Sequence, residues 1–188
     1  MKKQLLGNAS ITFLLILAAL LLYYQFLTKP EINENVPLPQ DLHPVVQKNK
    51  DVLIQKAAEK GIRVLVTDGF RSFEEQNLLY EKGRSKEGQI VTHAKGGDSY
   101  HNFGLAIDFA LLNKQGKALW DTTYDGNGNG KSDWMEVVGI AKELGFMWGG
   151  DWKQFKDYPH LEMRFDLTIN DLKRGKRPPE DALTASQN

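Results

Sequence analysis

The chain has 188 residues and no cysteine, and its 24 Lys and Arg residues balance 24 Asp and Glu residues. The lack of cysteine excludes a disulfide framework, a thiolate zinc site and a cysteine nucleophile, so any metal must be held by His, Asp or Glu. The neutral balance gives no reason to expect nucleic acid or an acidic membrane surface as a partner, because both attract basic proteins. The length predicts one folded domain.

The first 28 residues predict a segment that is separate from this domain. Lys2 and Lys3 precede a stretch without charged side chains, residues 4–28, whose centre is almost wholly apolar. About twenty apolar residues can span a bilayer as a helix. The stretch therefore predicts either an uncleaved transmembrane signal anchor or a cleaved signal peptide. In both cases the positive-inside rule predicts export, to the extracytoplasmic face of the membrane or the cell wall.

The remaining boundaries follow from composition. Residues 29–41 contain three prolines and no apolar periodicity, which predicts a linker. Residues 42–167 are expected to form the folded domain. Residues 168–188 contain a basic cluster and two adjacent prolines, which predicts a flexible tail.

Helix and strand patterns alternate inside the domain. Apolar periodicity and stop signals predict helices at residues 44–60, 72–83 and 134–144. The second of these helices begins with a capping box formed by Ser72 and Glu75. Alternating or β-branched patterns predict strands at residues 62–67, 105–111 and 161–165. The mixture indicates an α+β fold, a small antiparallel sheet with helices packed on one side.

The strand predicted at residues 105–111 carries a carboxylate at its centre. Bulky residues alternate there with two alanines and Asp108, so Asp108 lies on a face of small side chains. A carboxylate in that position must be paired or bind a metal, because an unpaired buried charge is costly. Gly104 lets the chain turn so that His101 can fold back toward Asp108, and His160 opens the last predicted strand. Two histidines and an aspartate form a three-ligand zinc site with a free fourth position; the alternative is a salt-bridged aspartate and two unrelated histidines.

Four short motifs follow one another along the domain. They are residues 69–72 (GFRS), 99–108 (SYHNFGLAID), 148–152 (WGGDW) and 157–160 (DYPH). In type and order they resemble those of the zinc peptidases of bacterial cell walls, the D-alanyl-D-alanine carboxypeptidases and dipeptidases. The sequence is most similar to the L-alanyl-D-glutamate endopeptidases of bacilli and some phage endolysins. The resemblance covers about residues 42–164.

The resemblance implies specific roles for five residues. It implies a zinc ion, in a cleft on the sheet, that is held by His101, Asp108 and His160. It further implies that Asp157 is the catalytic acid and base, and that Arg71 faces the substrate. A carboxylate over the open side of a metal can move a proton, and a fixed guanidinium can stabilise an oxyanion or hold a carboxylate. From the residues alone, a solvated loop aspartate and an exposed arginine are the alternatives.

Four further residues lie in or near these motifs. Glu162 lies on the same strand face as His160 and is expected either to orient that ligand or to be an ordinary surface residue. Ser99 and Tyr100 are expected to line the substrate cleft. The sequence assigns no role to His93.

A second cation pattern lies at residues 125–136 (DGNGNGKSDWME). It fits the twelve-residue calcium loop, with oxygen donors at the required places and glycine at the sixth. The expected structural Ca²⁺ ligands are Asp125, Asn127, Asn129, the backbone carbonyl of Lys131, Asp133 and Glu136. The alternative is a surface turn rich in Gly and Asn. The same segment lacks the first glycine and the preceding strand of a phosphate loop, so nucleotide binding is not expected.

Taken with the expected export, the resemblance implies a zinc metallopeptidase that hydrolyses peptidoglycan stem peptides, at the L-alanyl-D-glutamate bond. The membrane is an expected partner only if the N-terminal helix is uncleaved. A D-alanyl-D-alanine carboxypeptidase with the same three ligands is one alternative. A non-catalytic zinc-containing wall-binding module is another, although the presence of both Asp157 and Arg71 argues against it.

Overall fold

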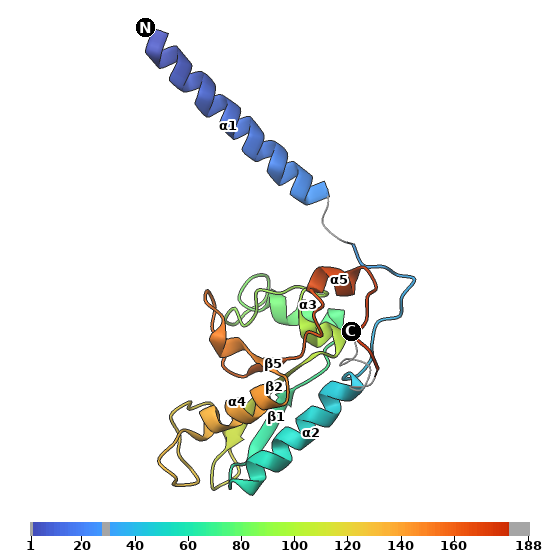
Figure 1. The fold of residues 1–188 in the computed structure, drawn as a ribbon, viewed down its shortest axis with the longest axis vertical. Helices are drawn as coiled ribbons and strands as arrows, with labels where there is room; N and C mark the ends of the chain where they lie inside the picture. The colour runs from blue at the N-terminus through green and yellow to red at the C-terminus, as the bar shows by residue number, and fades with distance from the viewer. Residues whose placement is uncertain (1, 28–30, 181–188) are drawn as a thin grey trace. The chain divides into compact units, whose positions relative to one another are not determined.

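The computed structural model describes residues 2–27 and 31–180 (Figure 1). The chain forms two compact units, residues 1–32 and residues 33–188. The first unit contains helix α1 (Lys2–Leu27). Within the described ranges, no helix combines the length and apolar character that crossing a membrane requires. Residues 1 and 28 of the segment predicted as a signal anchor or signal peptide lie outside the described residues.

The second unit is built on a five-stranded antiparallel sheet. Its strands are β1 (Val64–Asp68), β2 (Ala106–Leu112), β3 (Ala118–Leu119), β4 (Met147–Trp148) and β5 (His160–Glu162). They are arranged in the order β1-β2-β5-β4, and β3 also pairs with β2. The predicted α+β fold with a small antiparallel sheet is confirmed, and β2, which pairs with three strands, is its centre.

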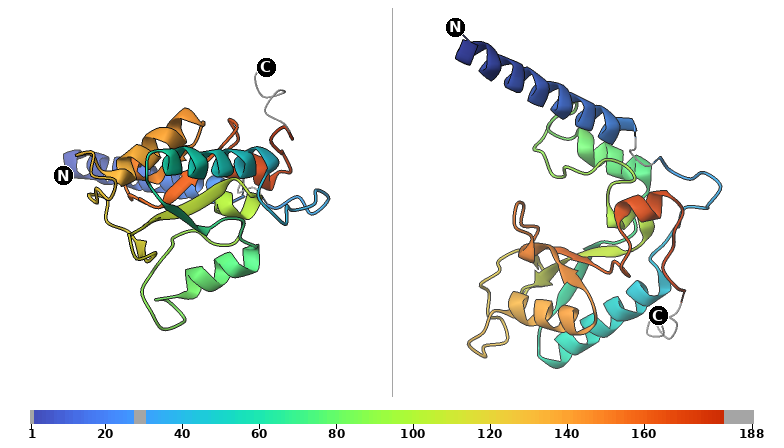
Figure 2. Two further views of the ribbon diagram at one scale, coloured as in Figure 1. Left: turned by 90° about the horizontal axis from the view of Figure 1, so that it is seen from below. Right: turned by 45° about the horizontal axis from the view of Figure 1, so that its top comes forward.

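The helices lie on both sides of the sheet. Helices α2 (Pro44–Glu59) and α4 (Asp133–Glu143) lie side by side on one face, whereas α3 (Phe73–Glu81) lies on the other (Figure 2). The prediction of helices on one side only is therefore wrong for α3. The reason is local: Arg71, at the start of α3, is held by carboxylates on the face of the sheet opposite α2 and α4. The 3-10 helices η1 (Tyr100–Phe103) and η2 (Gly149–Asp151) and the short helix α5 (Ile169–Lys173) complete the unit.

The core lies between the sheet and the pair α2 and α4. Ile107 and Phe109 of β2 are fully buried there with Leu53 of α2, and the ring centroid of Phe109 lies 4.4 Å from that of Trp134 in α4. Burial of each large apolar side chain is worth roughly 1.5–3 kcal/mol. Since alternate residues of a strand face opposite ways, this packing directs Asp108 to the other face.

The predicted tail begins as part of the fold. Thr168 and Asp171 form a capping box that starts α5, and Leu172 of that helix is buried. The backbone N–H of Asn33 donates to the carbonyl of Lys173 at 2.8 Å. The folded structure therefore extends past residue 167. The capping box of Thr168 and Asp171 starts a helix in a segment whose charges and prolines had predicted a flexible tail. Residues 181–188 of that tail lie outside the described residues.

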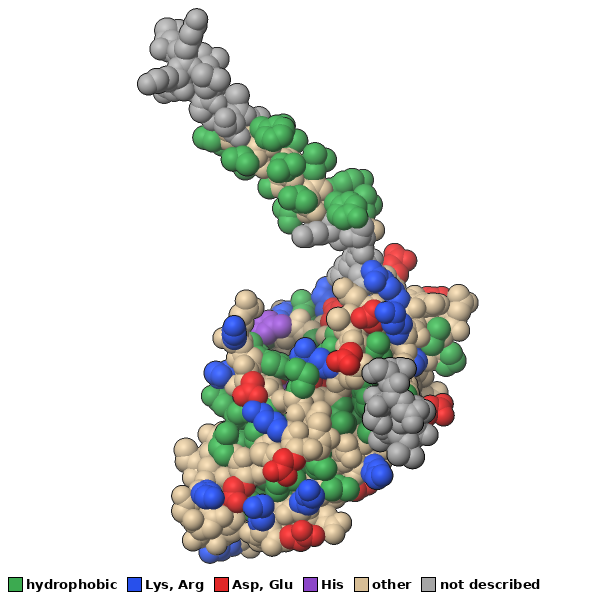
Figure 3. All heavy atoms as spheres, viewed as in Figure 1, with side chains coloured by type: hydrophobic (Ala, Val, Ile, Leu, Met, Phe, Trp, Pro, Cys, Tyr) green, Lys and Arg blue, Asp and Glu red, His purple; other side chains and the backbone are tan. Residues whose placement is uncertain are grey.

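Charged side chains of both signs are interspersed over the visible face of the second unit (Figure 3). This distribution agrees with the balance of 24 basic and 24 acidic residues in the whole sequence. A mixed surface of this kind produces no strong long-range field toward a charged polymer.

Candidate metal centre

Strand register brings two of the three predicted ligands together. Asp108 of β2 stands directly opposite His160 of β5 in the antiparallel ladder. His101 arrives from η1, which ends at Gly104 in a left-handed conformation with φ of 68°. A side chain at Gly104 would also collide with the backbone oxygen of Asp41. Glycine is therefore required for the turn that folds His101 back over the start of β2.

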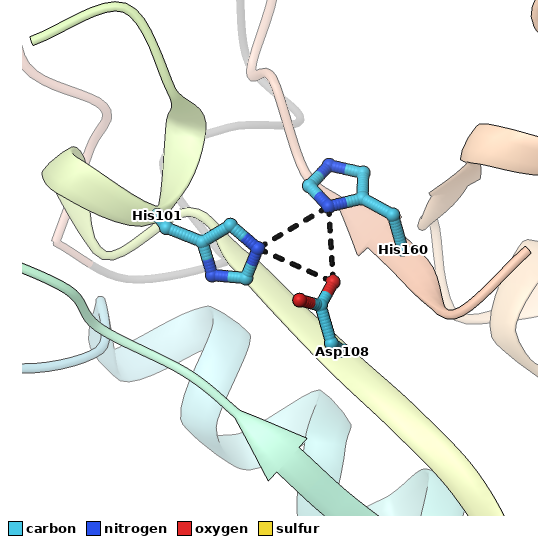
Figure 4. A group of neighbouring side chains, drawn as sticks. All are labelled: His101, Asp108 and His160. Carbon is cyan, nitrogen blue, oxygen red and sulfur yellow. Dashed lines mark hydrogen bonds and ion pairs between the residues drawn. The ribbon is translucent and has the colours of Figure 1, made fainter. Parts of the chain in front are cut away.

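The three side chains point toward one another (Figure 4). His101 Nε2 lies 3.3 Å from Asp108 Oδ1 and 3.2 Å from His160 Nδ1, and the distance from His160 Nδ1 to Asp108 Oδ1 is 3.2 Å. At zinc bond lengths of about 2.0–2.1 Å, tetrahedral ligand atoms lie roughly 3.3–3.4 Å apart. The three atoms therefore have the separations that a zinc ion requires. Among the described residues, this is the one group of three or more His, Asp or Glu side chains with metal-binding spacing.

The outer nitrogen of each histidine has its own partner. His101 Nδ1 lies 2.6 Å from the carbonyl oxygen of Gly69, and His160 Nε2 lies 3.0 Å from Glu162 Oε2. The Gly69 carbonyl and the Glu162 carboxylate can only accept, so each supports the tautomer in which a neutral ring carries its proton on the outer nitrogen. The inner nitrogens are then free to offer their lone pairs to a metal.

The electrostatics of the group agree with this geometry. Burial alone would raise the pKa of Asp108, but hydrogen bonds from His101 and His160 outweigh burial and hold that pKa well below its usual range. Burial likewise acts to lower the pKa of His160, but its bonds to Asp108 and Glu162 raise the pKa to about 9. The cluster thus contains an ionised carboxylate that strongly favours positive charge beside it.

Arg71 is fixed beside this cluster by a β-bulge. The register of β1 shifts between Val66 and Asp68, which places Asp68 opposite Asp108. The Arg71 guanidinium donates to Asp68, lies 3.7 Å from Asp108 and donates to Gln76 Oε1 at 2.8 Å. Its side chain is only 11% exposed. The alternative of an exposed arginine is therefore wrong, because two hydrogen-bond acceptors, Asp68 and Gln76, and the ion pair with Asp108 hold Arg71 at the site.

Asp157 reaches the same site from the loop before β5. Its backbone N–H donates to the carbonyl of Gly149 at 3.1 Å. A side chain at Gly149 would collide with the Asp157 backbone, so glycine permits this close approach. Burial, followed by the negative charge of Asp108, raises the pKa of Asp157, while the nearby histidines and arginine act to lower it. A half-buried carboxyl with a raised pKa is suited to proton transfer.

The five predicted site residues line one cavity of about 540 Å³. Ser99 and Tyr100 line it as well, as expected, and so do His93 and Glu162. The carboxylate of Glu162 contacts His160, so its side chain is part of the site and not of the surface.

Several lining residues were not identified from the sequence. They are Asp68, Asp98, Trp152, Phe155 and Arg164. Two of them had a usable signal: Asp68 ends the strand just before the motif of residues 69–72, and Arg164 follows Glu162 by two residues on the same strand face. Trp152 belongs to the motif of residues 148–152, but the motif gave it no role; its ring centroid lies 5.1 Å from that of His160.

The glycine-rich loop at residues 125–136 behaves differently. The carboxylate of Asp125 accepts hydrogen bonds from the backbone N–H groups of Gly128, Asn129 and Gly130. Glu136 accepts from the side-chain amides of Asn127 and Asn129. The carboxylates of Asp125 and Glu136, two of the expected Ca²⁺ ligands, are thus used in hydrogen bonds that close the loop on itself, and calcium binding is not supported.

Comparison with known proteins agrees with the motif order. A family model described as D-alanyl-D-alanine carboxypeptidase matches residues 92–163. The chain is 66% identical over 130 residues to the peptidoglycan L-alanyl-D-glutamate endopeptidase CwlK of Bacillus subtilis (strain 168), a match that covers 69% of this chain and 78% of that protein. It is 38% identical over 93 residues to the L-alanyl-D-glutamate peptidase of Listeria phage A118, covering 47% of this chain and 30% of that protein. The chain therefore belongs to this family of peptidoglycan peptidases.

Two solved structures were also compared with the chain. The L-Ala D-Glu endopeptidase ChiX of Serratia marcescens aligns with a TM-score of 0.46 and 24% identity, covering 67% of this chain and 83% of that one. The vancomycin-resistance D,D-pentapeptidase VanY in complex with Zn(II) aligns with a TM-score of 0.49 and 18% identity, covering 71% and 82%.

Proposed function

We propose that this chain is a zinc-dependent endopeptidase that hydrolyses the bond between L-Ala and D-Glu in peptidoglycan stem peptides. The observation that carries the metal assignment is the triangle of inward-facing atoms from His101, Asp108 and His160, with sides of 3.2–3.3 Å. The choice of bond is supported by 66% identity to an L-alanyl-D-glutamate endopeptidase.

The donor set fits zinc. His101 Nε2, a carboxylate oxygen of Asp108 and His160 Nδ1 would hold the ion, and a cavity adjoins them for a fourth ligand. When bound there, zinc lowers the pKa of a water molecule to around 7 and polarises a carbonyl group. Two histidines and one carboxylate leave the ion with net positive charge, which that chemistry requires.

Asp157 is the proposed acid and base. Its carboxylate takes a proton from the attacking water and then returns it to the nitrogen of the leaving amine. The raised pKa of Asp157 serves both steps, because a carboxyl that holds its proton more readily is a better base and remains able to donate.

Arg71 is proposed to supply a fixed positive charge to the cavity wall. Asp68 and Gln76 hold the guanidinium in place, so little reorganisation is needed when negative charge develops on the substrate carbonyl. Charge placed in advance in a partly dehydrated site stabilises a transition state more than a mobile side chain does. Because peptidoglycan lies outside the cytoplasm, we also propose extracytoplasmic action.

The proposal is tested with a defined muramyl pentapeptide and mass spectrometry of the products. We expect release of a peptide that begins with D-Glu, with L-Ala left on the muramic acid, and loss of this product when zinc is chelated. The family model that matches is described as D-alanyl-D-alanine carboxypeptidase, so removal of the terminal D-Ala is the second candidate. Free D-Ala with the L-Ala–D-Glu bond intact would select that candidate, and no cleavage at all would favour a binding module.

A further inference from the structure

We propose that Glu162, held by Arg164, is a positioning residue that orients His160 for metal binding. The inference rests on the proposed metal site and assigns a task to two side chains outside the ligand triangle. It concerns which nitrogen of His160 carries the proton and how firmly the ring is held.

Glu162 is the most deeply buried carboxylate near the site, with 1% of its surface exposed. Its two oxygens have different partners. Oε2 lies 3.0 Å from His160 Nε2, and Oε1 accepts from Arg164 Nε at 2.6 Å and from a second guanidinium nitrogen of Arg164. Both oxygens are therefore used, and Arg164 compensates the charge that burial would otherwise make costly.

The strand pattern explains how these side chains meet. His160, Glu162 and Arg164 are spaced two residues apart, so they project from the same face of the chain at β5. The residue opposite Glu162 in the ladder is Ala106, which leaves room for the carboxylate. Arg164 is itself held, because its guanidinium lies 5.2 Å from the centre of the Tyr100 ring.

The consequence concerns the inner nitrogen. A carboxylate that faces Nε2 keeps the proton there, so the lone pair of neutral His160 is on Nδ1, the atom that completes the triangle. His101 is held in the same way by the backbone carbonyl of Gly69, which no side-chain substitution removes. Of the two outer partners, only Glu162 can therefore be changed by a side-chain substitution, and that substitution tests the positioning of His160. Partners of this kind typically change metal affinity 10–100-fold when they are lost.

The alternative is that Glu162 and Arg164 form a buried ion pair that only stabilises the fold. The substitution Glu162→Gln separates the two explanations, because it keeps the shape of the side chain. Arg164 draws the amide oxygen toward itself, which turns the NH2 group toward His160 Nε2. That nitrogen must then act as an acceptor, and the proton moves to Nδ1, where it competes with the metal.

The first experiment measures zinc affinity by competition with a chelator. We expect Glu162→Gln to weaken zinc binding about 10–100-fold, and Glu143→Gln, which makes the same change at an exposed position of α4, to leave it unchanged. Adding Arg164→Met to the first variant frees the amide to turn its oxygen toward His160, so part of the affinity should return. Equal affinity in Glu162→Gln and the unaltered protein would overturn the proposal.

A second measurement needs neither a variant nor zinc. In the metal-free protein, the Nε2 proton of His160 should give a protected, low-field NMR signal, because it is bonded to a buried carboxylate. Rapid exchange of that proton with water would overturn the positioning role. If the unaltered protein binds no zinc while this signal is present, the proposed function fails and the positioning contact stands.

Discussion

The triangle of His101, Asp108 and His160 and the loop at residues 125–136 are the two regions in which the sequence contains a cation-binding pattern. In the triangle, three atoms that can all offer lone pairs face one another at 3.2–3.3 Å. In the loop, the carboxylate of Asp125 already accepts three backbone N–H groups. The comparison shows that ligand spacing in the sequence does not by itself define a site; the ligand atoms must also converge on one point.

The two regions differ in what they do without a cation. Burial acts to lower the pKa of His160, but the carboxylates of Asp108 and Glu162 raise it to about 9, so the triangle favours a positive charge at its centre. In the loop, three backbone N–H groups already compensate the charge of the Asp125 carboxylate. We therefore expect metal to be essential in the first region and without effect in the second.

Removal of a ligand should give the largest effect. His160→Ala is expected to reduce zinc from about one per chain to a small fraction, because two ligands rarely hold zinc in a protein site. Metal analysis of the purified protein measures this. His93→Ala, at a histidine that lines the cavity outside the triangle, is the matched control and should retain zinc. Full zinc content in His160→Ala would show that the triangle is not the metal site.

Asp157→Asn should separate catalysis from metal binding. We expect peptidase activity to fall at least about 100-fold, the usual contribution of a positioned acid and base, while the zinc content stays the same. Product formation from a defined muropeptide gives the rate. Asp151→Asn, which changes an exposed carboxylate paired with Lys142, should cleave at the normal rate. A near-normal rate in Asp157→Asn would reduce that residue to a structural loop position.

The calcium-like loop should respond to its hydrogen bonds and not to calcium. Asp125→Ala removes an acceptor of three N–H groups and should cost roughly 1 kcal/mol, as loss of a helix N-cap does, or about 2–4 °C in melting temperature. Thermal melts with and without millimolar calcium should coincide for both proteins. A calcium-dependent rise in the unaltered protein that disappears in Asp125→Ala would restore the calcium site.

The smallest effect is expected at the capping box of α5. Hydrogen bonds from Lys176 and then Thr168 lower the pKa of Asp171, whose side chain is partly exposed. A lowered folded-state pKa stabilises the protein above the unfolded pKa and loses this contribution as pH falls through the acid range. Asp171→Asn should therefore lower the melting temperature by no more than about 2 °C at pH 7. The difference between the two proteins should shrink steadily as pH falls below the unfolded pKa of about 4; a difference that grows toward acid pH would contradict this sign.

Local patterns in the sequence predicted those parts of the molecule that depend on neighbouring residues. The alternation around Asp108 identified its strand and face, and Ser72 with Glu75 identified the start of α3. The bulge that sets Asp68 opposite Asp108 arises from pairing between distant strands, which no local pattern records. For the same reason the sequence did not indicate which face α3 covers.

Side-chain partners were the least predictable feature. The twelve-residue pattern correctly located oxygens close together in the loop, but it could not show that backbone amides occupy them. The role of Glu162 remained open until its contacts with His160 and Arg164 were known. The N-terminal segment was interpreted from apolar content alone, and no described helix meets the requirements for crossing a membrane.

Anomalous X-ray diffraction from zinc-loaded crystals, recorded on both sides of the zinc absorption edge, tests the central claim most directly. We predict one strong zinc peak within bonding distance of His101 Nε2, Asp108 and His160 Nδ1, with Asp157 and Arg71 beside it and no peak in the loop at residues 125–136. A zinc peak bound elsewhere, with the three side chains turned away from one another, would contradict the assignment.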